Sequence, residues 1–251
     1  MQLPAEYFAE SGGLPGRDVG AFLASAWPRF LAEPSDIPGQ AKRISMSREE
    51  MAKRNRTWAI RRSAGGALAA CAYAVLIRAE PDAAAYPAEG WSFAVDAALQ
   101  SESAPNCLCL VSVTVDPACR GLGFPRFLIE AAKREAHALG FKFLLVPLRP
   151  TRKNEFPSES MDAFARRLDP GGKIFDPWLR THVEAGTEIL NACSDSVVVT
   201  ASLTRWRAWT GLALDDPGEV ILPGGLAPLT VDLEKGTATY REPNLWLRYR
   251  L

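Results

Sequence analysis

Hydrophobic side chains form an unbroken run at residues 107–115 (CLCLVSVTV), which is rich in β-branched residues and has no turn signal. Such a run is typical of a strand covered on both faces of a sheet. Hydrophobic positions then recur with helical spacing, at residues 124, 127, 128, 131, 132, 136 and 139. Gly140 is a good stop for this helix, and residues 141–148 (FKFLLVPL) predict a second buried strand. Strand, helix and strand in this order predict a right-handed crossover with parallel strands.

The segments around this unit have weaker patterns. Residues 58–62 and 67–78 flank a glycine turn at 63–66 and predict two antiparallel strands. A short helix is predicted at 91–99, in an excursion from the sheet placed to border a substrate pocket. Later segments predict an irregular stretch to about residue 173, a helix at 175–190, a strand at 196–201 and a hairpin around 234–237.

The N-terminal segment has helical pieces broken by prolines, for example at 19–31 and at the capped stretch 47–50. We therefore expect a single α/β (α+β) domain over residues 1–251, with a central mixed twisted sheet flanked by helices. It would have a helical N-terminal extension at 1–56, a core at 57–155, and a C-terminal portion at 156–251 that ends in the hairpin.

Composition argues against several classes of partner. Lysine plus arginine number 29 and aspartate plus glutamate number 29, so bulk charge gives no reason to expect nucleic acid or an anionic membrane. The start of the chain lacks the features of a secretory signal, and the longest apolar stretch, 67–77, is far shorter than the roughly 20 residues of a spanning helix. We expect a cytoplasmic protein without a metal site, because its thiols form no C-x-x-C pair and are predicted to be reduced and buried: Cys71, Cys107, Cys109, Cys119 and Cys193.

A glycine loop, RGLGFP at residues 120–125, lies between the first buried strand and the predicted helix. Free backbone N–H groups and the positive end of the helix dipole meet there, and both favour a bound phosphate. Gly121 and Gly123 allow close approach, and Arg120 and Arg126 add positive charge. A dinucleotide fingerprint would need a third glycine in place of Arg126, and a P-loop would need Gly-Lys-Ser/Thr. The loop therefore predicts a pyrophosphate cradle of another kind.

Residues 115–128 (VDPACRGLGFPRFL) resemble motif A of the GNAT acetyltransferase superfamily, in which Arg/Gln-x-x-Gly-x-Gly/Ala follows a strand ending in Val-x-Pro. The resemblance covers about residues 57–155 in fold order. Five further segments are similar to a bacterial GNAT-like subgroup: PLRPTRK (147–153), FDPWLR (175–180), RWRAWTG (205–211), LPGGLAP (222–228) and REPNLW (241–246). This resemblance implies a GNAT fold and acetyl-CoA or another acyl-CoA as co-substrate.

Carried over residue by residue, the resemblance implies that the pyrophosphate is held by Arg120, Gly121, Leu122, Gly123, Phe124, Pro125 and Arg126. It also implies that pantetheine runs beside the backbone of Val113, Thr114 and Val115. The thioester would lie near Ser112 or Val113, where two parallel strands of the family's fold splay apart, and an N–H near Val113 would bind the oxyanion.

Two features depart from the family pattern. Pro125 stands where the family has glycine or alanine, and losing its N–H would cost about 1 to 3 kcal/mol of ligand affinity. The asparagine that commonly follows the family's fifth strand is absent, because residues 149–153 form a basic loop there. This loop either meets phosphates or is solvated.

Acyl transfer to an amine needs a neutral nucleophile, an oxyanion donor and a proton source for the thiolate. Glu242 is our candidate base, with Asp176 behind it, and Tyr240 is the candidate acid. Each has a structural alternative, since Glu242 can pair with Arg241, Asp176 can initiate a turn and Tyr240 can simply pack. His182 is expected to be a buried, hydrogen-bonded residue rather than a base.

The sequence thus predicts an acyl-CoA-dependent N-acyltransferase that moves an acyl group, with acetyl favoured, to a small-molecule amine. An acyl-carrier protein is an alternative donor, because carrier-bound pantetheine presents a single phosphodiester and suits a cradle weakened at Pro125. A non-catalytic module that binds CoA thioesters is the second alternative. The acceptor, the acyl chain and the oligomeric state, a homodimer included, stay open.

Overall fold

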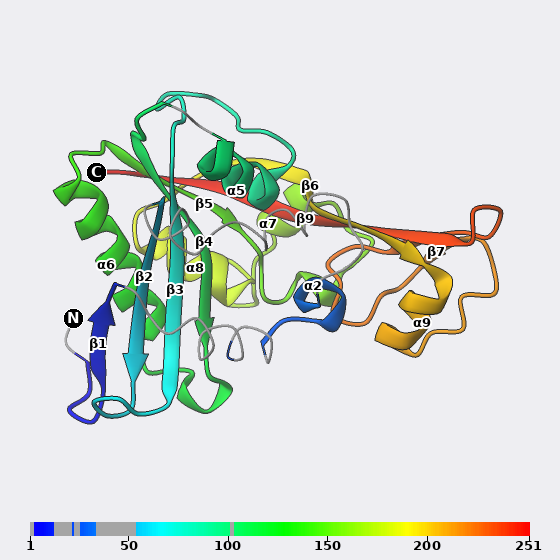
Figure 1. The fold of residues 1–251 in the computed structure, drawn as a ribbon, viewed down its shortest axis with the longest axis horizontal. Coiled ribbons are helices and arrows are strands. Elements are labelled where there is room, and N and C mark those ends of the chain that lie inside the picture. Colours follow the sequence, from blue (N-terminus) through cyan, green and yellow to red (C-terminus); the bar gives the residue numbers. More distant parts are fainter. Residues whose placement is uncertain (1–2, 13–21, 23–25, 34–53, 101–102) are drawn as a thin grey trace.

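A computed structural model describes residues 3–12, 22, 26–33, 54–100 and 103–251 of the chain (Figure 1). Its strands are β1 (Phe8–Ser11), β2 (Asn55–Arg61), β3 (Leu68–Ile77), β4 (Cys107–Val115), β5 (Phe143–Leu148), β6 (Glu188–Ser202), β7 (Gly218–Val220), β8 (Leu229–Asp232) and β9 (Thr237–Arg250). Its α-helices are α2 (Arg29–Ala32), α5 (Gly90–Gln100), α6 (Phe124–Ala138), α7 (Met161–Ala165), α8 (Pro177–Glu184) and α9 (Leu203–Thr210).

All described strands belong to one mixed sheet, in the order β1-β2-β3-β4-β5-β9-β8-β7, with β6 also paired to β9. The first four strands are antiparallel neighbours. The polypeptide then crosses through α6, and β5 pairs with β4 in parallel. Figure 1 shows β9 (red) running from this main sheet toward α9 and β7. We call this part the distal lobe; it consists of α9, β7, β8 and the adjoining ends of β6 and β9, and α2 packs onto it through Phe30.

The parallel pair β4 and β5 diverges after a short contact. The two strands pair only at Leu108 with Leu144 and at Cys109 with Leu145. The β3–β4 register shifts by one residue at this point, which leaves Val111 of β4 as the extra residue of a β-bulge. Beyond the bulge β4 stays with β3, whereas β5 stays with β9, and the sheet is split between them.

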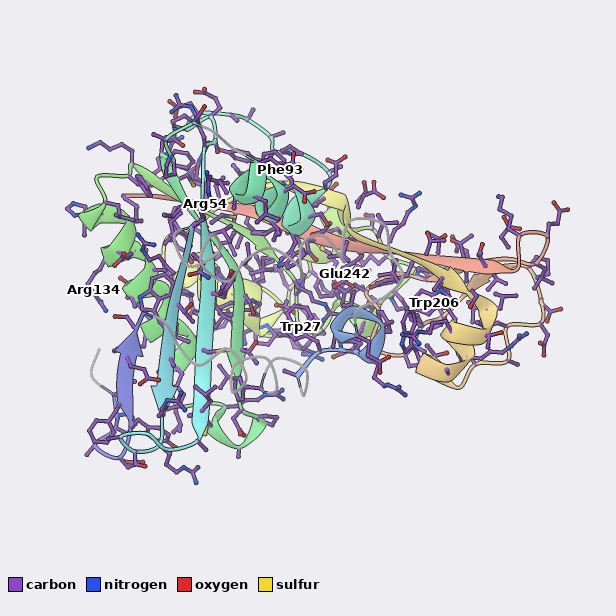
Figure 2. All side chains as sticks on the ribbon, in the orientation of Figure 1. Trp27, Arg54, Phe93, Arg134, Trp206 and Glu242 are labelled. Atoms are coloured by element: carbon purple, nitrogen blue, oxygen red, sulfur yellow. The ribbon has the colours of Figure 1, made fainter. Side chains whose placement is uncertain are left out.

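Helices cover both faces of the main sheet. On one face α6 and α8 pack onto a core that includes Leu128 and Leu179. On the other face α5 packs with Ala94 and Ala98 against a second cluster. A third cluster, built around Trp206, fills the distal lobe (Figure 2).

The structure confirms the strand–helix–strand prediction as β4, α6 and β5. It also confirms the β2–β3 hairpin, the helix α5 and the terminal β8–β9 hairpin. The buried thiols are confirmed as well, since all five cysteines are free and buried. Burial raises the pKa of the Cys71 thiol to about 11. In the described part of the chain, no helix combines the length and apolar character needed to traverse a bilayer.

The helix predicted at 175–190 is wrong in its second half. It ends at Glu184, because Gly186 adopts a φ of +87° that a right-handed helix does not allow, and β6 begins at Glu188. The strand predicted at 196–201 is part of this longer β6. Residues 8–11, within the segment expected to be helical, form β1 beside β2. The helix predicted at 47–50 lies outside the described residues, as do residues 19–21 and 23–25 of the helix predicted at 19–31. Residues 29–31 of that second prediction are part of α2.

Candidate functional site

A cleft of about 610 Å³ opens where β4 and β5 separate. Its floor is formed by residues 110–115 of β4 and residues 146–149 at the end of β5. One end reaches the glycine loop before α6. The remaining walls come from several elements: Ala26, Trp27, Trp91, Thr151, Arg152, Pro177, Trp178, Thr181 and Asn244.

The glycine loop has the backbone geometry of an anion cradle. Gly121 and Gly123 both have left-handed φ angles, +83° and 76° respectively, which glycine adopts at little cost. Gly123 is the N-cap of α6, and Pro125 occupies the first helical turn. N–H groups of that turn, apart from the one that Pro125 lacks, therefore point out of the helix toward a ligand.

Of the residues predicted to hold the cofactor, six line the cleft, and the other four, which include the exposed Leu122 and the N-cap Gly123, do not. Those that line the cleft are Val113, Thr114, Val115, Arg120, Gly121 and Pro125. Phe124 instead turns its ring into the core against Tyr7, and Arg126 lines an adjacent hollow on α6. Arg120 is exposed and forms no ion pair with another described residue, so its guanidinium is available to an anion.

Arg149 closes the opposite end of the cleft. Its Nη2 donates to the Gly224 carbonyl oxygen at 2.8 Å, and its guanidinium lies over the Trp27 ring at 5.5 Å. Its Nε donates to Glu242, which is buried and also accepts a hydrogen bond from the Tyr240 hydroxyl. Figure 2 shows Trp27 and Glu242 in the middle of the molecule, between the main sheet and the distal lobe.

Glu242 and Tyr240 are therefore brought together, but behind Arg149 rather than in the cleft lining. The Tyr240 hydroxyl also accepts the Leu226 N–H at 2.7 Å. Burial, with the negative charge of Glu242 adding to it, raises the pKa of Tyr240 above its ordinary value. This geometry suits a rigid support for Arg149.

Asp176 is the N-cap of α8 and is almost fully buried. Its Oδ1 accepts N–H groups of Trp178 at 3.0 Å and Leu179 at 2.8 Å. Its Oδ2 accepts the Arg152 N–H at 2.8 Å and the Thr151 hydroxyl at 3.1 Å. These bonds fix the loop after β5 to the start of α8, and both of these segments line the cleft.

His182 is buried, as expected, and its Nδ1 lies 2.7 Å from the Tyr249 hydroxyl. Burial lowers the pKa of His182 to about 3, so the ring is neutral near pH 7. Its neighbour Thr181 lines the cleft, whereas the ring belongs to the core behind it.

Sequence reasoning missed Lys153 and Asn244. Lys153 is fully buried, and its Nζ donates to the carbonyl oxygens of Phe156 at 2.7 Å, Leu226 at 2.8 Å and Pro157 at 3.4 Å. Asn244 is 4% exposed and lines the cleft. Both residues could have been found in the sequence, because they lie in segments that resemble the GNAT-like subgroup, Lys153 in 147–153 and Asn244 in 241–246. In the structure these two segments lie together with two others of that set, 175–180 and 222–228.

No protein-family model matches the chain. The arginine N-acetyltransferase avaD of Aspergillus versicolor is 30% identical over 184 residues, which are 64% of this chain and 63% of that relative. The loading GNATL domain of CurA from Lyngbya majuscula has a TM-score of 0.58 at 14% identity and 97% coverage of each chain. The GNAT-like decarboxylase GphF, solved with isobutyryl-CoA, has a TM-score of 0.53 at 19% identity, over 97% of this chain and 98% of that one.

These comparisons show that the chain has the fold of GNAT proteins. Its fold is the GNAT fold predicted from the sequence, with a central mixed sheet flanked by helices. The divergence of β4 and β5 occurs at the strands that the resemblance to this superfamily implied. The chain spans 63% of the length of its fungal relative.

Proposed function

We propose that this GNAT protein is an acyl-CoA-dependent N-acyltransferase that transfers an acyl group, acetyl in the simplest case, to a small-molecule amine. One observation carries the proposal. A single cleft joins a phosphate cradle at the start of α6 to the open edge of β4, where β5 no longer pairs with it.

The elements that line the cleft suit the successive parts of an acyl-CoA. Arg120 and the free N–H groups at the start of α6 suit the pyrophosphate. The edge of Val113, Thr114 and Val115 that faces away from β3 has no strand partner in β5, so it can pair with the amides of pantetheine as a strand would. The thioester then lies near Ser112 and Val113.

The reaction is direct attack of the amine nitrogen on the thioester carbonyl carbon. A C–N bond forms, the oxyanion is stabilised by a main-chain N–H near Val113, and the C–S bond then breaks. The proton lost by nitrogen balances the proton gained by the thiolate. Glu242, Tyr240 and Asp176 stay predictions for direct catalysis, and their burial and bonding support a positioning role instead.

The similarity to an arginine N-acetyltransferase supports acetyl as the acyl group and an amino acid as a first acceptor to try. Calorimetric titration with acetyl-CoA and CoA is the first test, followed by release of CoA thiol with arginine and a broad amine panel. We expect binding and amine-dependent release. Absence of binding at millimolar concentration overturns the proposal, and tight binding with background release would favour a thioester-binding module.

An acyl-carrier protein is the second candidate donor, because Pro125 removes one donor from the cradle. The similar structure from CurA is a loading domain, and this similarity is a reason to test a carrier protein as donor. Turnover with an acyl-carrier protein but not with acyl-CoA would favour this candidate.

A further inference from the structure

Asn244 carries an unsatisfied acceptor at the cleft. Its Nδ2 donates to the Pro147 carbonyl oxygen at 3.3 Å, and its Oδ1 has no hydrogen-bond partner among the described residues although it is buried. Only the nitrogen of the amide can pair with a carbonyl oxygen, so this contact fixes which way the side chain is turned. The free oxygen of a buried group that lines the cleft is suited to an N–H donor from a bound molecule.

Arg149 lies next to Asn244 on the same face of the sheet. Glu242, which holds Arg149, and Asn244 are two residues apart on β9, and such residues share a face about 7 Å apart. The guanidinium has five N–H donors, of which one is used by Glu242 and one by Gly224. The remaining donors offer a planar fork to a carboxylate in the cleft.

This pair lies away from the phosphate cradle. Trp246 shares the Asn244 face of β9 and packs against Phe93 of α5, with ring centroids 6.3 Å apart. The cradle stands at the start of α6, which covers the opposite face of the sheet. The cleft therefore passes between β4 and β5 from the α6 side, which suits the cofactor, to the α5 side, where Trp91 adds an indole wall.

We infer that the acceptor is a carboxylate-bearing amine of the α-amino acid type, with its amine N–H bound by Asn244 Oδ1 and its carboxylate bound by Arg149. This inference rests on the proposed function and names its acceptor class. An α-amino acid carries both groups on one carbon, which suits recognition by two neighbouring side chains. Trp27 and Trp91 then border its side chain.

The test compares amino acids with their decarboxylated counterparts: phenylalanine with 2-phenylethylamine, tryptophan with tryptamine, and arginine with agmatine. We expect the amino acid of the preferred pair to have a kcat/KM at least about tenfold higher, as for a charge-assisted hydrogen bond. Arg149→Lys should abolish this preference mainly through KM, because lysine lacks the fork. Asn244→Leu should lower kcat/KM for both members of the pair.

Arg241→Lys is the matched control. Arg241 precedes Glu242 on β9, points to the opposite face and pairs with Asp195, so this variant should keep the preference. Acetyl-CoA affinity, measured for every variant, should not change, which separates acceptor binding from misfolding.

Equal or better turnover of the decarboxylated amines, or an unchanged preference in Arg149→Lys, overturns the inference and leaves the proposed function standing. Acetyl-CoA binding without release of CoA for any amine overturns the proposed function and the inference together.

Discussion

Gly121 and Gly140 stand at the two ends of α6 with similar backbone angles, φ +83° and +75°. In both cases a Cβ added to the glycine would meet nothing within 4 Å. The two glycines therefore share one conformational requirement, whereas only Gly121 lines the cleft. A comparison of the two positions therefore distinguishes the effect of a glycine on the backbone conformation from its effect on ligand binding.

Gly121→Ala and Gly140→Ala should each destabilise the fold by about 1 kcal/mol, because alanine is strained at positive φ. Only Gly121→Ala should also weaken acetyl-CoA binding, by about tenfold, since its methyl group stands where the phosphate approaches the backbone. Urea denaturation and calorimetry measure the two effects. Equal acetyl-CoA affinity in both variants would show that the phosphate binds elsewhere.

His182 makes stability depend on pH. The folded pKa of His182 is about 3, below the ordinary histidine value of 6.5, so its contribution is fully present above pH 6.5 and is lost as pH falls through about 3. Between pH 7.5 and pH 5 the wild type should lose about 2 kcal/mol from this residue. His182→Asn should be less stable than the wild type at pH 7.5 but should lack this pH dependence. The difference in free energy of unfolding between the two proteins, measured by denaturation, should therefore be about 2 kcal/mol smaller at pH 5 than at pH 7.5. A constant difference between them would contradict the neutral, buried ring.

At the scale of the element, α6 combines a sound helix start with an incomplete anion site. Pro125 fits the first turn because the N–H it lacks would have no partner inside the helix. That same N–H would be a donor to a phosphate. Pro125 is therefore compatible with the helix but removes one possible donor from the anion site.

Pro125→Ala restores the donor, and we expect CoA to bind about five- to tenfold more tightly, the gain of one hydrogen bond. The free energy of unfolding should change little, because alanine is also a good helix former. Calorimetry with CoA measures the gain in affinity. The ratio of the rates with acyl-CoA and with an acylated carrier protein shows whether the variant also shifts its preference toward acyl-CoA. An unchanged dissociation constant would place the phosphate away from this turn.

The elements that sequence predicted correctly are those fixed by local patterns. The run at β4, the helical spacing of α6 and the glycine at its end involve residues close together in the chain. The helix predicted at 175–190 failed because its hydrophobic spacing continues past Gly186, where pairing with β9 decides the structure. A strand such as β6, whose first residue Glu188 pairs with the distant Arg248, leaves a weak local signal.

The same distinction applies to the site. The cradle is local, so the glycine loop could be predicted from the sequence. Asn244 meets Pro147, and Arg149 meets Glu242, only because β5 and β9 are neighbours in the sheet. The sequence does not reveal that Glu242 pairs with Arg149, because the two residues are 93 positions apart and no spacing rule relates them.

At the scale of the whole molecule, the cleft lies at the junction of the main sheet and the distal lobe. The β6–β9 pair joins them, and the loop 222–228 returns from the lobe to contact Arg149 through Gly224 and Lys153 through Leu226. Burial lowers the pKa of Lys153, yet its ammonium is held by three carbonyl oxygens. This lysine therefore fixes the lobe to the wall of the cleft.

Lys153→Met keeps the apolar stem but leaves these buried carbonyl oxygens without their donor, which should cost about 1 to 3 kcal/mol of stability. Because the loop also holds Arg149, kcat/KM for the acceptor should fall while acetyl-CoA affinity stays unchanged. Lys133→Met is the matched control, since this partly exposed lysine of α6 bonds Glu130 and the Ala185 carbonyl oxygen, and its loss should cost less than about 1 kcal/mol. Equal stability of the two variants, measured by urea denaturation, would mean that the lobe is held by the β6–β9 pair alone.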